Sequence, residues 1–205
     1  MAQTDPVLPR HIAPSPEWVP APPTPQIEAP FGVRLVDPDT SDTAVIAAWM
    51  RLPALVKGWE QDWPDEQWRG HLKAQLDGSY SRPFLLSFRD EPFGYLEVYR
   101  AAQDVIGAKC NADPFDLGMH WAVGHPSMFG KGYMVSLVPQ LAKSLFAAEP
   151  QCRRIMGDPD HRNTANRRLL EHLGLISIGE HQMSPERRIV LYSLPRSHGD
   201  VPTSA

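Results

Sequence analysis

Two stretches of the chain decide its fold: LGMHWAVGHPSMFGKGY at residues 117–133 and MGDPDHRNTANRRLLEHLGL at residues 156–175. Each passes from a run suited to a strand, through a loop with glycine or proline, toward a segment with the spacing of an amphipathic helix. In the second stretch Gly174 ends the helix, because glycine readily adopts the left-handed conformation that follows many helices. The sequence therefore predicts two strand–loop–helix units, with helices over residues 133–146 and 163–173.

The first loop ends in Gly130-Lys131-Gly132, immediately before the helix. Glycines let the backbone approach a ligand closely, the N–H groups of the turn converge, and the helix N-terminus is electropositive. Lys131 adds a positive charge, so the turn is a candidate anion site that suits a pyrophosphate. Its spacing matches neither a nucleotide-binding P-loop nor the dinucleotide fingerprint. A helix that merely needs glycines to turn is an equally good interpretation of this motif alone.

The remaining pattern alternates between strands and helices. Ser41 is suited to cap a helix whose apolar residues continue to Leu52, and a second helix is expected over residues 65–76. Residues 56–63 are aromatic and are expected to be irregular, and residues 89–92 to join two strands as a hairpin. Strands are expected at 31–36, 84–88, 93–99, 117–123, 154–157, 176–181 and 188–193. This order predicts an α/β (α+β) domain, a mixed sheet with helices on its faces.

Composition separates the two ends from this domain. Residues 1–30 contain nine prolines and are expected to form an extended or disordered tail, with a Pro-rich ligand for another domain as the alternative. The domain is expected over residues 31–195, and the polar residues 196–205 are expected to form a C-terminal tail.

Bulk properties exclude several classes of protein. The chain has 205 residues, of which 42% are hydrophobic and 21% charged, as in ordinary globular proteins. Its two cysteines, Cys110 and Cys152, are far apart, which argues against a disulfide scaffold and a zinc site. No signal peptide or spanning segment is evident, and the net charge of −4 gives no reason to expect nucleic acid. We expect a monomeric cytoplasmic protein without a metal or a permanently bound cofactor.

Taken together, the two opening stretches resemble the GNAT superfamily of N-acyltransferases. The turn Gly130-x-Gly132 lies where that superfamily has Q/R-x-x-G-x-G/A, and residues 163–175 are similar to its N-x-x-A-x-x-L-Y-x-K-x-G-F helix. The resemblance implies one domain with helices on both faces of a splayed, mostly antiparallel sheet. It also implies that an acyl thioester binds through its phosphopantetheine arm, as acyl-CoA or on a carrier. The implied binding residues are Gly130, Lys131, Gly132, Tyr133 and Asn163.

Three segments are similar, more narrowly, to the siderophore branch of this superfamily, the lysine N-acyltransferases of mycobactin biosynthesis. They are residues 117–121, 129–133 and 157–163. This similarity implies a transferase of iron acquisition that moves a medium- or long-chain fatty acyl group to the ε-amino group of a lysine. The implied donor is an acyl carrier protein or coenzyme A. His120 is implied as a substrate-binding residue and Asp158 as the proton acceptor.

The chemistry requires such an acceptor, because a lysine amine has a pKa near ~10.4 and must lose a proton before it attacks a thioester. A carboxylate or an imidazole within hydrogen-bond reach can take it. Asp160 is the rival base, unless it caps the following helix. Taken alone, His120 is better explained as a buried structural histidine than as a binding residue, and its place beside the turn and the resemblance reverse that preference. A backbone N–H near residues 121–123 is expected to polarise the thioester carbonyl.

Three positions depart from the superfamily pattern. Ser127 replaces Gln or Arg, Asn166 replaces Ala, and Leu170 replaces the Tyr that commonly protonates the leaving thiolate. A tyrosine acid at that place is therefore excluded. Two other interpretations stay open: an acetyl-CoA-dependent N-acetyltransferase of a small amine or aminoglycoside, and a non-catalytic binding module.

Several aromatic residues have two alternative interpretations, packing in the core or binding a ligand. The tryptophans Trp59, Trp63 and Trp68 are expected in the core more often than in an acyl or acceptor pocket. Tyr133 is as well suited to packing as to binding a cofactor. The helix positions expected in the core are Met134, Leu137, Val138, Leu141 and Leu145.

Overall fold

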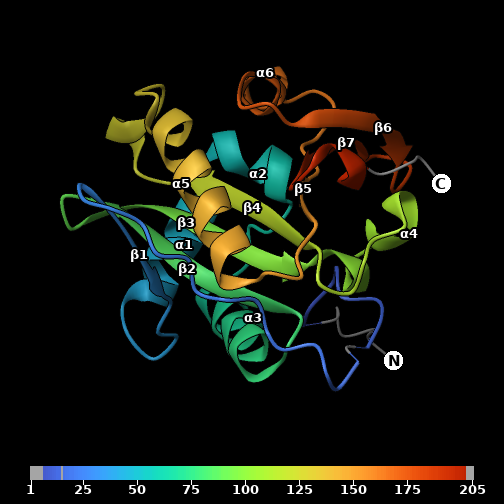
Figure 1. Ribbon diagram of the computed structural model, residues 1–205. Helices are drawn as coiled ribbons and strands as arrows, with labels where there is room; N and C mark the ends of the chain where they lie inside the picture. The colour runs from blue at the N-terminus through green and yellow to red at the C-terminus, as the bar shows by residue number, and fades with distance from the viewer. Residues whose placement is uncertain (1–6, 15, 202–205) are drawn as a thin grey trace.

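A seven-stranded sheet forms the centre of the computed structural model, which describes residues 7–14 and 16–201 (Figure 1). Its order is β1-β2-β3-β4-β5-β7-β6, and β4 with β5 is the parallel pair among otherwise antiparallel neighbours. This confirms the predicted mixed, mostly antiparallel sheet. The strands are β1 Phe31–Leu35, β2 Ser81–Phe88, β3 Glu91–Arg100, β4 Leu117–Val123, β5 Arg154–Gly157, β6 Ile176–Gln182 and β7 Arg188–Pro195.

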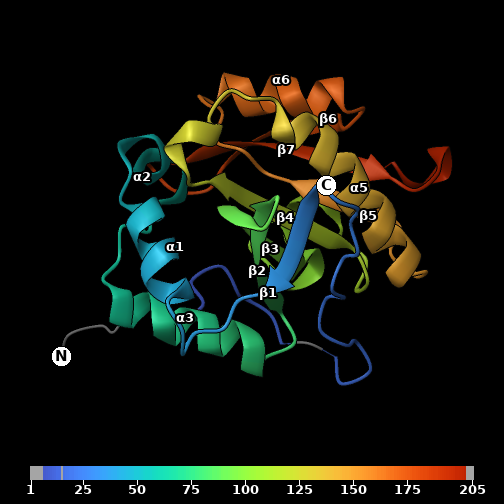
Figure 2. The same ribbon diagram turned by 90° about the vertical axis from the view of Figure 1, so that its left-hand side faces the viewer.

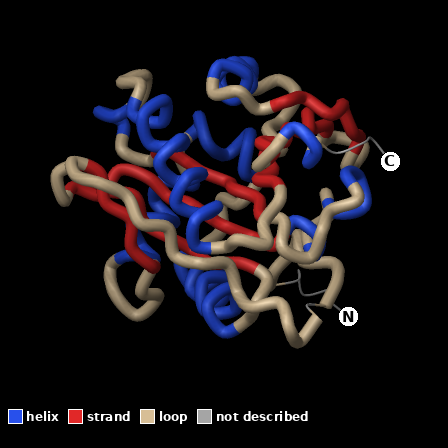
Figure 3. Tube along the Cα trace, viewed as in Figure 1, coloured by secondary structure: helices blue, strands red, loops and turns tan. Residues whose placement is uncertain are grey.

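Helices cover both faces of this sheet (Figures 1 and 2). The helices are α1 Asp42–Met50, α2 Pro53–Trp59, α3 Asp65–Asp77, α4 Gly107–Cys110, α5 Tyr133–Ala148 and α6 Thr164–His172. Single 3-10 turns occur at Ala101–Gln103, Pro126–Met128 and His198–Asp200. The tube view shows helix α5 crossing in front of the strands, with α1 and α3 behind them (Figure 3).

The alternation of side chains along the strands produces the two cores. On β2, Phe84 and Leu86 pack with α5, while Leu85 between them packs with α1 and α3. On β3, Leu96 and Tyr95 divide between the two faces in the same way. All five predicted core positions of α5 are buried, which confirms its apolar face.

Two local expectations were wrong. Residues 53–59 form helix α2, which takes in the first half of the segment 56–63 that was expected to be irregular. Pro53 supplies the fixed φ that suits a first helical turn, and Glu60 ends the helix at φ 55°. The hairpin between β2 and β3 is also shorter than the expected four-residue link, because Arg89 and Asp90 at φ 51° and 68° make a two-residue turn.

Residues 7–14 and 16–30 lie against the domain without forming a helix or a long strand. The backbone N–H of Gln26 donates to Ser144 Oγ on α5 at 2.6 Å, and Arg100 Nε donates to the carbonyl of Pro20 at 3.0 Å. The expected boundaries at residues 30 and 195 stay predictions. Among the described residues, no helix is both long and apolar enough to cross a membrane. Cys110 and Cys152 are separate, buried thiols.

Candidate active site

The two central parallel strands separate soon after they meet. Their pairing consists of Leu117 with Ile155 and Gly118 with Met156. Strand β4 then continues to Val123, whereas β5 ends at Gly157. Within the described part of the chain, the last five residues of β4 therefore have no partner strand on the β5 side. This is the splay that the resemblance to the GNAT superfamily implied.

His120 and Asp158 meet where the strands separate. His120 lies on β4, two residues beyond its last pairing with β5, and Asp158 directly follows β5. Their side chains are joined by a 2.7 Å contact between His120 Nε2 and Asp158 Oδ1. The side chain of His120 is 16% exposed, and that of Asp158 is 0% exposed. The histidine is therefore the member of the pair that a substrate reaches first.

Asp158 is a buried carboxylate with donors on both oxygens. Tyr99 Oη donates to Oδ1 at 3.0 Å, and Arg10 Nη2 donates to Oδ2 at 2.8 Å. Burial raises the pKa of Asp158, but the nearby positive charges of Arg10 and His120 outweigh it and hold the pKa well below its ordinary value. Asp158 is therefore an ionised carboxylate, and its negative charge is directed at the His120 ring.

The His120 ring is enclosed by aromatic and acidic side chains. It stacks on Tyr99 with 4.5 Å between centroids, and the Trp59 ring lies edge-on at 6.0 Å. Its Nδ1 lies 3.3 Å from Glu97 Oε2. Burial lowers the pKa of His120 and the Arg10 charge lowers it further, but the charge of Asp158 and the hydrogen bonds to Asp158 and Glu97 together raise the pKa above its ordinary value. The ring is thus prepared to hold a proton.

Glu97 extends this polar network on the face of the sheet that α3 covers. Gln75 Nε2 and Tyr95 Oη each donate to its Oε1 at 2.9 Å, and His71 Nε2 lies 3.3 Å from the same oxygen. Burial raises the pKa of Glu97, yet its hydrogen bonds with His120 and His71 hold the pKa well below its ordinary value. His120 therefore lies between two ionised carboxylates.

The raised pKa of His120 leads to a prediction about pH. Below that pKa the His120–Asp158 pair already holds its proton and cannot accept another, so kcat/KM should rise as the pH passes through it. We expect this break above pH ~6.5, the ordinary histidine value, and separate from the break of free lysine near ~10.4. A kcat/KM profile across this range measures it, and a break below the ordinary histidine value would contradict the assignment.

Gly118 leaves the space that Tyr99 needs beside this pair. A Cβ atom at residue 118 would overlap the Tyr99 ring, including its hydroxyl. We expect Gly118→Ala to destabilise the fold by about 1–3 kcal/mol, as overpacking does, and to lower kcat by displacing Tyr99 from His120 and Asp158. Urea unfolding and initial rates measure both effects. Gly70→Ala on α3, where a Cβ meets nothing within 4 Å, is the matched control. A Gly118→Ala protein as stable and active as the parent would contradict this packing.

The predicted anion cradle lies between the end of β4 and the start of α5. Gly130 and Gly132 have φ 67° and 74°, and Gly132 is the residue before the first turn of α5. Only glycine adopts this backbone readily, and a Cβ at either place would meet open space, so the requirement is conformational. Lys131 is exposed beside them. The role of all three in binding an anion stays a prediction.

The other two predicted donor-binding residues have structural contacts. Tyr133 packs among the rings of Phe31, Phe88 and Phe93, at 5.9, 4.6 and 6.0 Å between centroids. Asn163 caps α6, since its Oδ1 accepts from the backbone N–H of Asn166 at 3.1 Å. Binding by either side chain stays a prediction.

The three tryptophans have different positions. Trp68 is fully buried in the core, and Trp63 contacts it with 5.3 Å between ring centroids. Trp59 instead lies beside His120 and Tyr95. Of the three, Trp59 contributes to the wall of the site.

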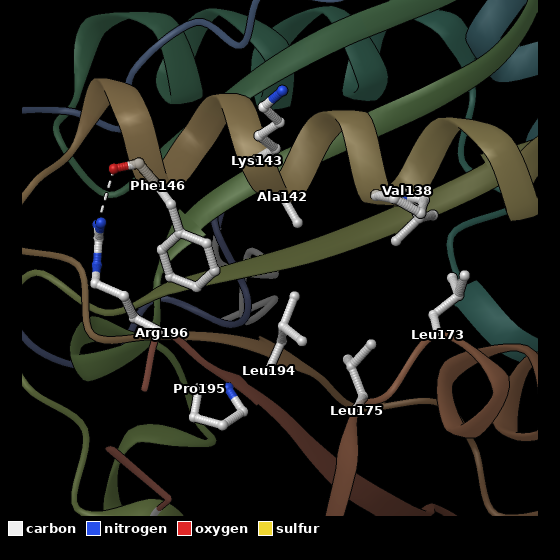
Figure 4. A pocket seen from close by; sticks show the side chains of 10 residues that line it. Val138, Ala142, Lys143, Phe146, Leu173, Leu175, Leu194, Pro195 and Arg196 are labelled. Atoms are coloured by element: carbon white, nitrogen blue, oxygen red, sulfur yellow. Dashed lines mark hydrogen bonds between the residues drawn. The ribbon is translucent and has the colours of Figure 1, made fainter. Parts of the chain in front are cut away.

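An apolar groove of ≈ 280 Å³ opens on the α5 side of the sheet. Figure 4 shows Val138, Ala142 and Phe146 of α5 facing Leu173, Leu175 and Leu194 across it. Arg196 closes one end by donating from Nη2 to the Phe146 carbonyl at 2.8 Å. The groove contains none of the site residues predicted from the sequence, and His120 projects from the opposite face of the sheet with Glu97.

Sequence reasoning missed Glu97, Tyr99 and Arg10. A signal existed for Glu97, because a charged residue inside an apolar central strand is unusual unless it is paired. Arg10 gave no comparable signal, since its contact with Asp158 joins residues 148 positions apart.

Comparison with known proteins identifies the family of this chain. The sequence profile of the acetyltransferase (GNAT) domain matches residues 39–183. The lysine N-acyltransferase MbtK of Mycobacterium sp. (strain MCS) is 46% identical over 96% of this chain and 81% of that protein. MbtK of Mycobacterium tuberculosis (strain CDC 1551 / Oshkosh) is 46% identical over 90% of this chain and 84% of that protein.

Solved structures share the fold at lower identity. The aminoglycoside acetyltransferase AAC(6')-Ib in complex with coenzyme A superposes with a TM-score of 0.71 at 24% identity, covering 81% of this chain and 95% of that one. The chain therefore belongs to the acetyltransferase (GNAT) family and is a homologue of the lysine N-acyltransferase MbtK within it.

Proposed function

We propose that this acyltransferase moves a medium- or long-chain fatty acyl group from a thioester to the ε-amino group of a lysine, in the biosynthesis of a mycobactin-type siderophore. The observation that carries the proposal is the His120–Asp158 pair at the point where β4 and β5 separate. The names of the relatives support lysine as the acceptor.

The proton of the attacking amine goes to this pair. The amine approaches His120, the more exposed member of the pair. Its proton goes to Nδ1, whose 3.3 Å contact with Glu97 is the longer of the two ring contacts, while Nε2–H donates to Asp158 at 2.7 Å. Asp158 supplies the negative charge that makes the ring a proton acceptor, so the two side chains act as one unit. This proposal combines the expected proton acceptor, Asp158, with the expected substrate contact, His120.

The bond changes need little further help from the protein. The amine nitrogen forms a bond to the thioester carbonyl carbon, the carbon–sulfur bond breaks, and the sulfur leaves as a thiolate. A thiol has a pKa near ~8.5, so the thiolate departs without a strong acid. Leu170, buried where the superfamily commonly has tyrosine, therefore need not block the reaction. The unpaired edge of β4 near residues 121–123 is the proposed source of an N–H for the carbonyl oxygen.

The donor is proposed to bind with its phosphate groups at Gly130, Lys131 and Gly132. The positive φ of both glycines and the exposed lysine support this position. An acyl carrier protein and coenzyme A share the phosphopantetheine arm, and both stay candidate donors. A monomeric state and a cytoplasmic location stay predictions.

Activity with a panel of donors tests the proposal. Acetyl, octanoyl and palmitoyl thioesters, each on coenzyme A and on an acyl carrier protein, are offered with lysine and thiol release is followed. We expect the long-chain donors to give the higher kcat/KM. Strict use of acetyl would contradict the fatty acyl proposal, and donor binding without transfer to lysine would favour a non-catalytic module.

A further inference from the structure

The N-terminal segment reaches the active site, although it precedes the matched family domain. The Arg10 guanidinium lies between two buried carboxylates. It donates to Asp104 from Nε at 3.0 Å and from Nη2 at 2.7 Å, and from Nη2 to Asp158 Oδ2 at 2.8 Å. The Arg10 side chain is 18% exposed, and both carboxylate side chains are 0% exposed.

Neighbouring contacts fix Arg10 in this position. Its carbonyl accepts from the backbone N–H of Val105 at 3.1 Å, and the N–H of Ile12 donates to the carbonyl of Gln103 at 3.0 Å. The His11 ring stacks on Tyr80, with 4.7 Å between centroids and 9° between planes. Tyr80 in turn donates to Asp104 at 2.5 Å. Arg10 is therefore held in place by a network of backbone hydrogen bonds, a ring stack and a buried carboxylate.

The same segment makes a second connection to His120. His71 Nδ1 donates to the carbonyl of Val7 at 2.7 Å. His71 Nε2 lies 3.3 Å from Glu97 Oε1, and Glu97 Oε2 lies 3.3 Å from His120 Nδ1. Both carboxylates beside His120 are thus connected to residues 7–12, Asp158 through Arg10 and Glu97 through His71.

We infer that Arg10 is a positioning residue of this active site: it holds Asp158 against His120, so that residues 7–12 form part of the catalytic apparatus. This inference adds a residue to the proposed active site and rests on the proposed function for the reaction. The contacts of Arg10 do not depend on that function. Arg10 binds Oδ2 of Asp158 and leaves Oδ1 directed at the imidazole.

Arg10 also sets the charge balance around His120. Without Arg10, the buried carboxylates of Asp104 and Asp158 would lose the positive charge that they share. The loss would lower the folding stability more than it would for two exposed carboxylates. The Arg10 charge opposes the rise in the pKa of His120, so the pair releases its proton at a lower pH than it otherwise would. The groups that face the pair are Arg10, Trp59, Glu97 and Tyr99, with a further positive charge from Arg187 acting on Asp158.

The test compares Arg10→Gln with Arg154→Gln in the full chain. Arg154 is the matched control because it donates from Nε to buried Asp116 at 2.7 Å, at the opposite end of β5 from Asp158. For Arg10→Gln we expect kcat/KM at pH 7 to fall about tenfold or more, with the break in the pH profile moved to higher pH and KM for the donor unchanged. For Arg154→Gln we expect lower stability and an unmoved break.

Two further measurements separate an effect on the His120 pKa from a general loss of activity or folding. An NMR titration of the His120 ring, assigned with His120→Gln, should show its pKa raised in Arg10→Gln, and it needs no turnover. It therefore separates failure of this inference from failure of the proposed reaction. Arg10→Lys keeps the charge but loses the bidentate contact. We expect it to keep the parent break in the pH profile and to lower kcat, which supplies the test if Arg10→Gln does not fold.

An unmoved His120 titration in folded Arg10→Gln would overturn the inference, as would parent activity in Arg10→Lys. An increase in kcat/KM on removal of Arg10 would also overturn it, since that is the result expected if the guanidinium merely occupies the place of the substrate amine.

Discussion

Replacing Asp158 with asparagine should reduce kcat/KM for acyl transfer to lysine by about 10²–10⁴-fold, the range that a positioned proton acceptor contributes. Asparagine keeps the shape of the side chain but removes the charge that His120 Nε2 contacts at 2.7 Å. The pKa of His120 should fall at the same time, because Asp158 contributes most of what raises it against burial. Initial rates across pH measure both effects.

Asp160→Asn is the control for this change. Asp160 is the neighbouring carboxylate, and its side chain accepts from Arg162 Nε and Nη2 at 2.8 Å each. We expect this variant to keep most of the activity. Full turnover in Asp158→Asn, or a comparable loss in Asp160→Asn, would show that the acceptor has been assigned to the wrong carboxylate.

Replacing His120 with glutamine should lower kcat by about 10²-fold and remove the break in the pH profile. The glutamine amide can still donate to Asp158, but it cannot take a proton at these pH values. The effect should appear in kcat, because His120 is the exposed member of the pair and is proposed to take the proton.

His172→Gln, an exposed position at the end of α6, is the matched histidine control and should leave kcat and KM unchanged. If His120→Gln instead raises KM for lysine and leaves kcat intact, His120 only binds the substrate and Asp158 accepts the proton by another route.

Most of the fold was predictable because local signals and long-range packing agree. The apolar spacing from Met134 to Leu145 predicted α5, and the structure buries that face. Gly174 predicted the end of α6 and has φ 84°. Helix α2 was missed because it is short and none of its residues is fully buried, so it carries no periodic apolar signal.

The site was predictable in part. His120 and Asp158 lie in the two stretches that resemble the superfamily, and the structure brings them into contact. The contact between them depends on the parallel pairing of β4 and β5, which sequence spacing does not give. Tyr99 and Arg10 come from β3 and from the N-terminal segment. A carboxylate with low exposure needs such partners, but single-sequence patterns do not reveal which distant residues supply them.

Above all, we propose that the His120–Asp158 pair takes a proton from a lysine ε-amine as it attacks a fatty acyl thioester. Tandem mass spectrometry of the product, made from lysine and palmitoyl thioester by the parent protein and by folded Asp158→Asn, tests it most directly. We predict the acyl group on the ε-nitrogen with the parent protein and only trace product with Asp158→Asn. An acyl group on another atom, or equal product from both proteins, would contradict the claim.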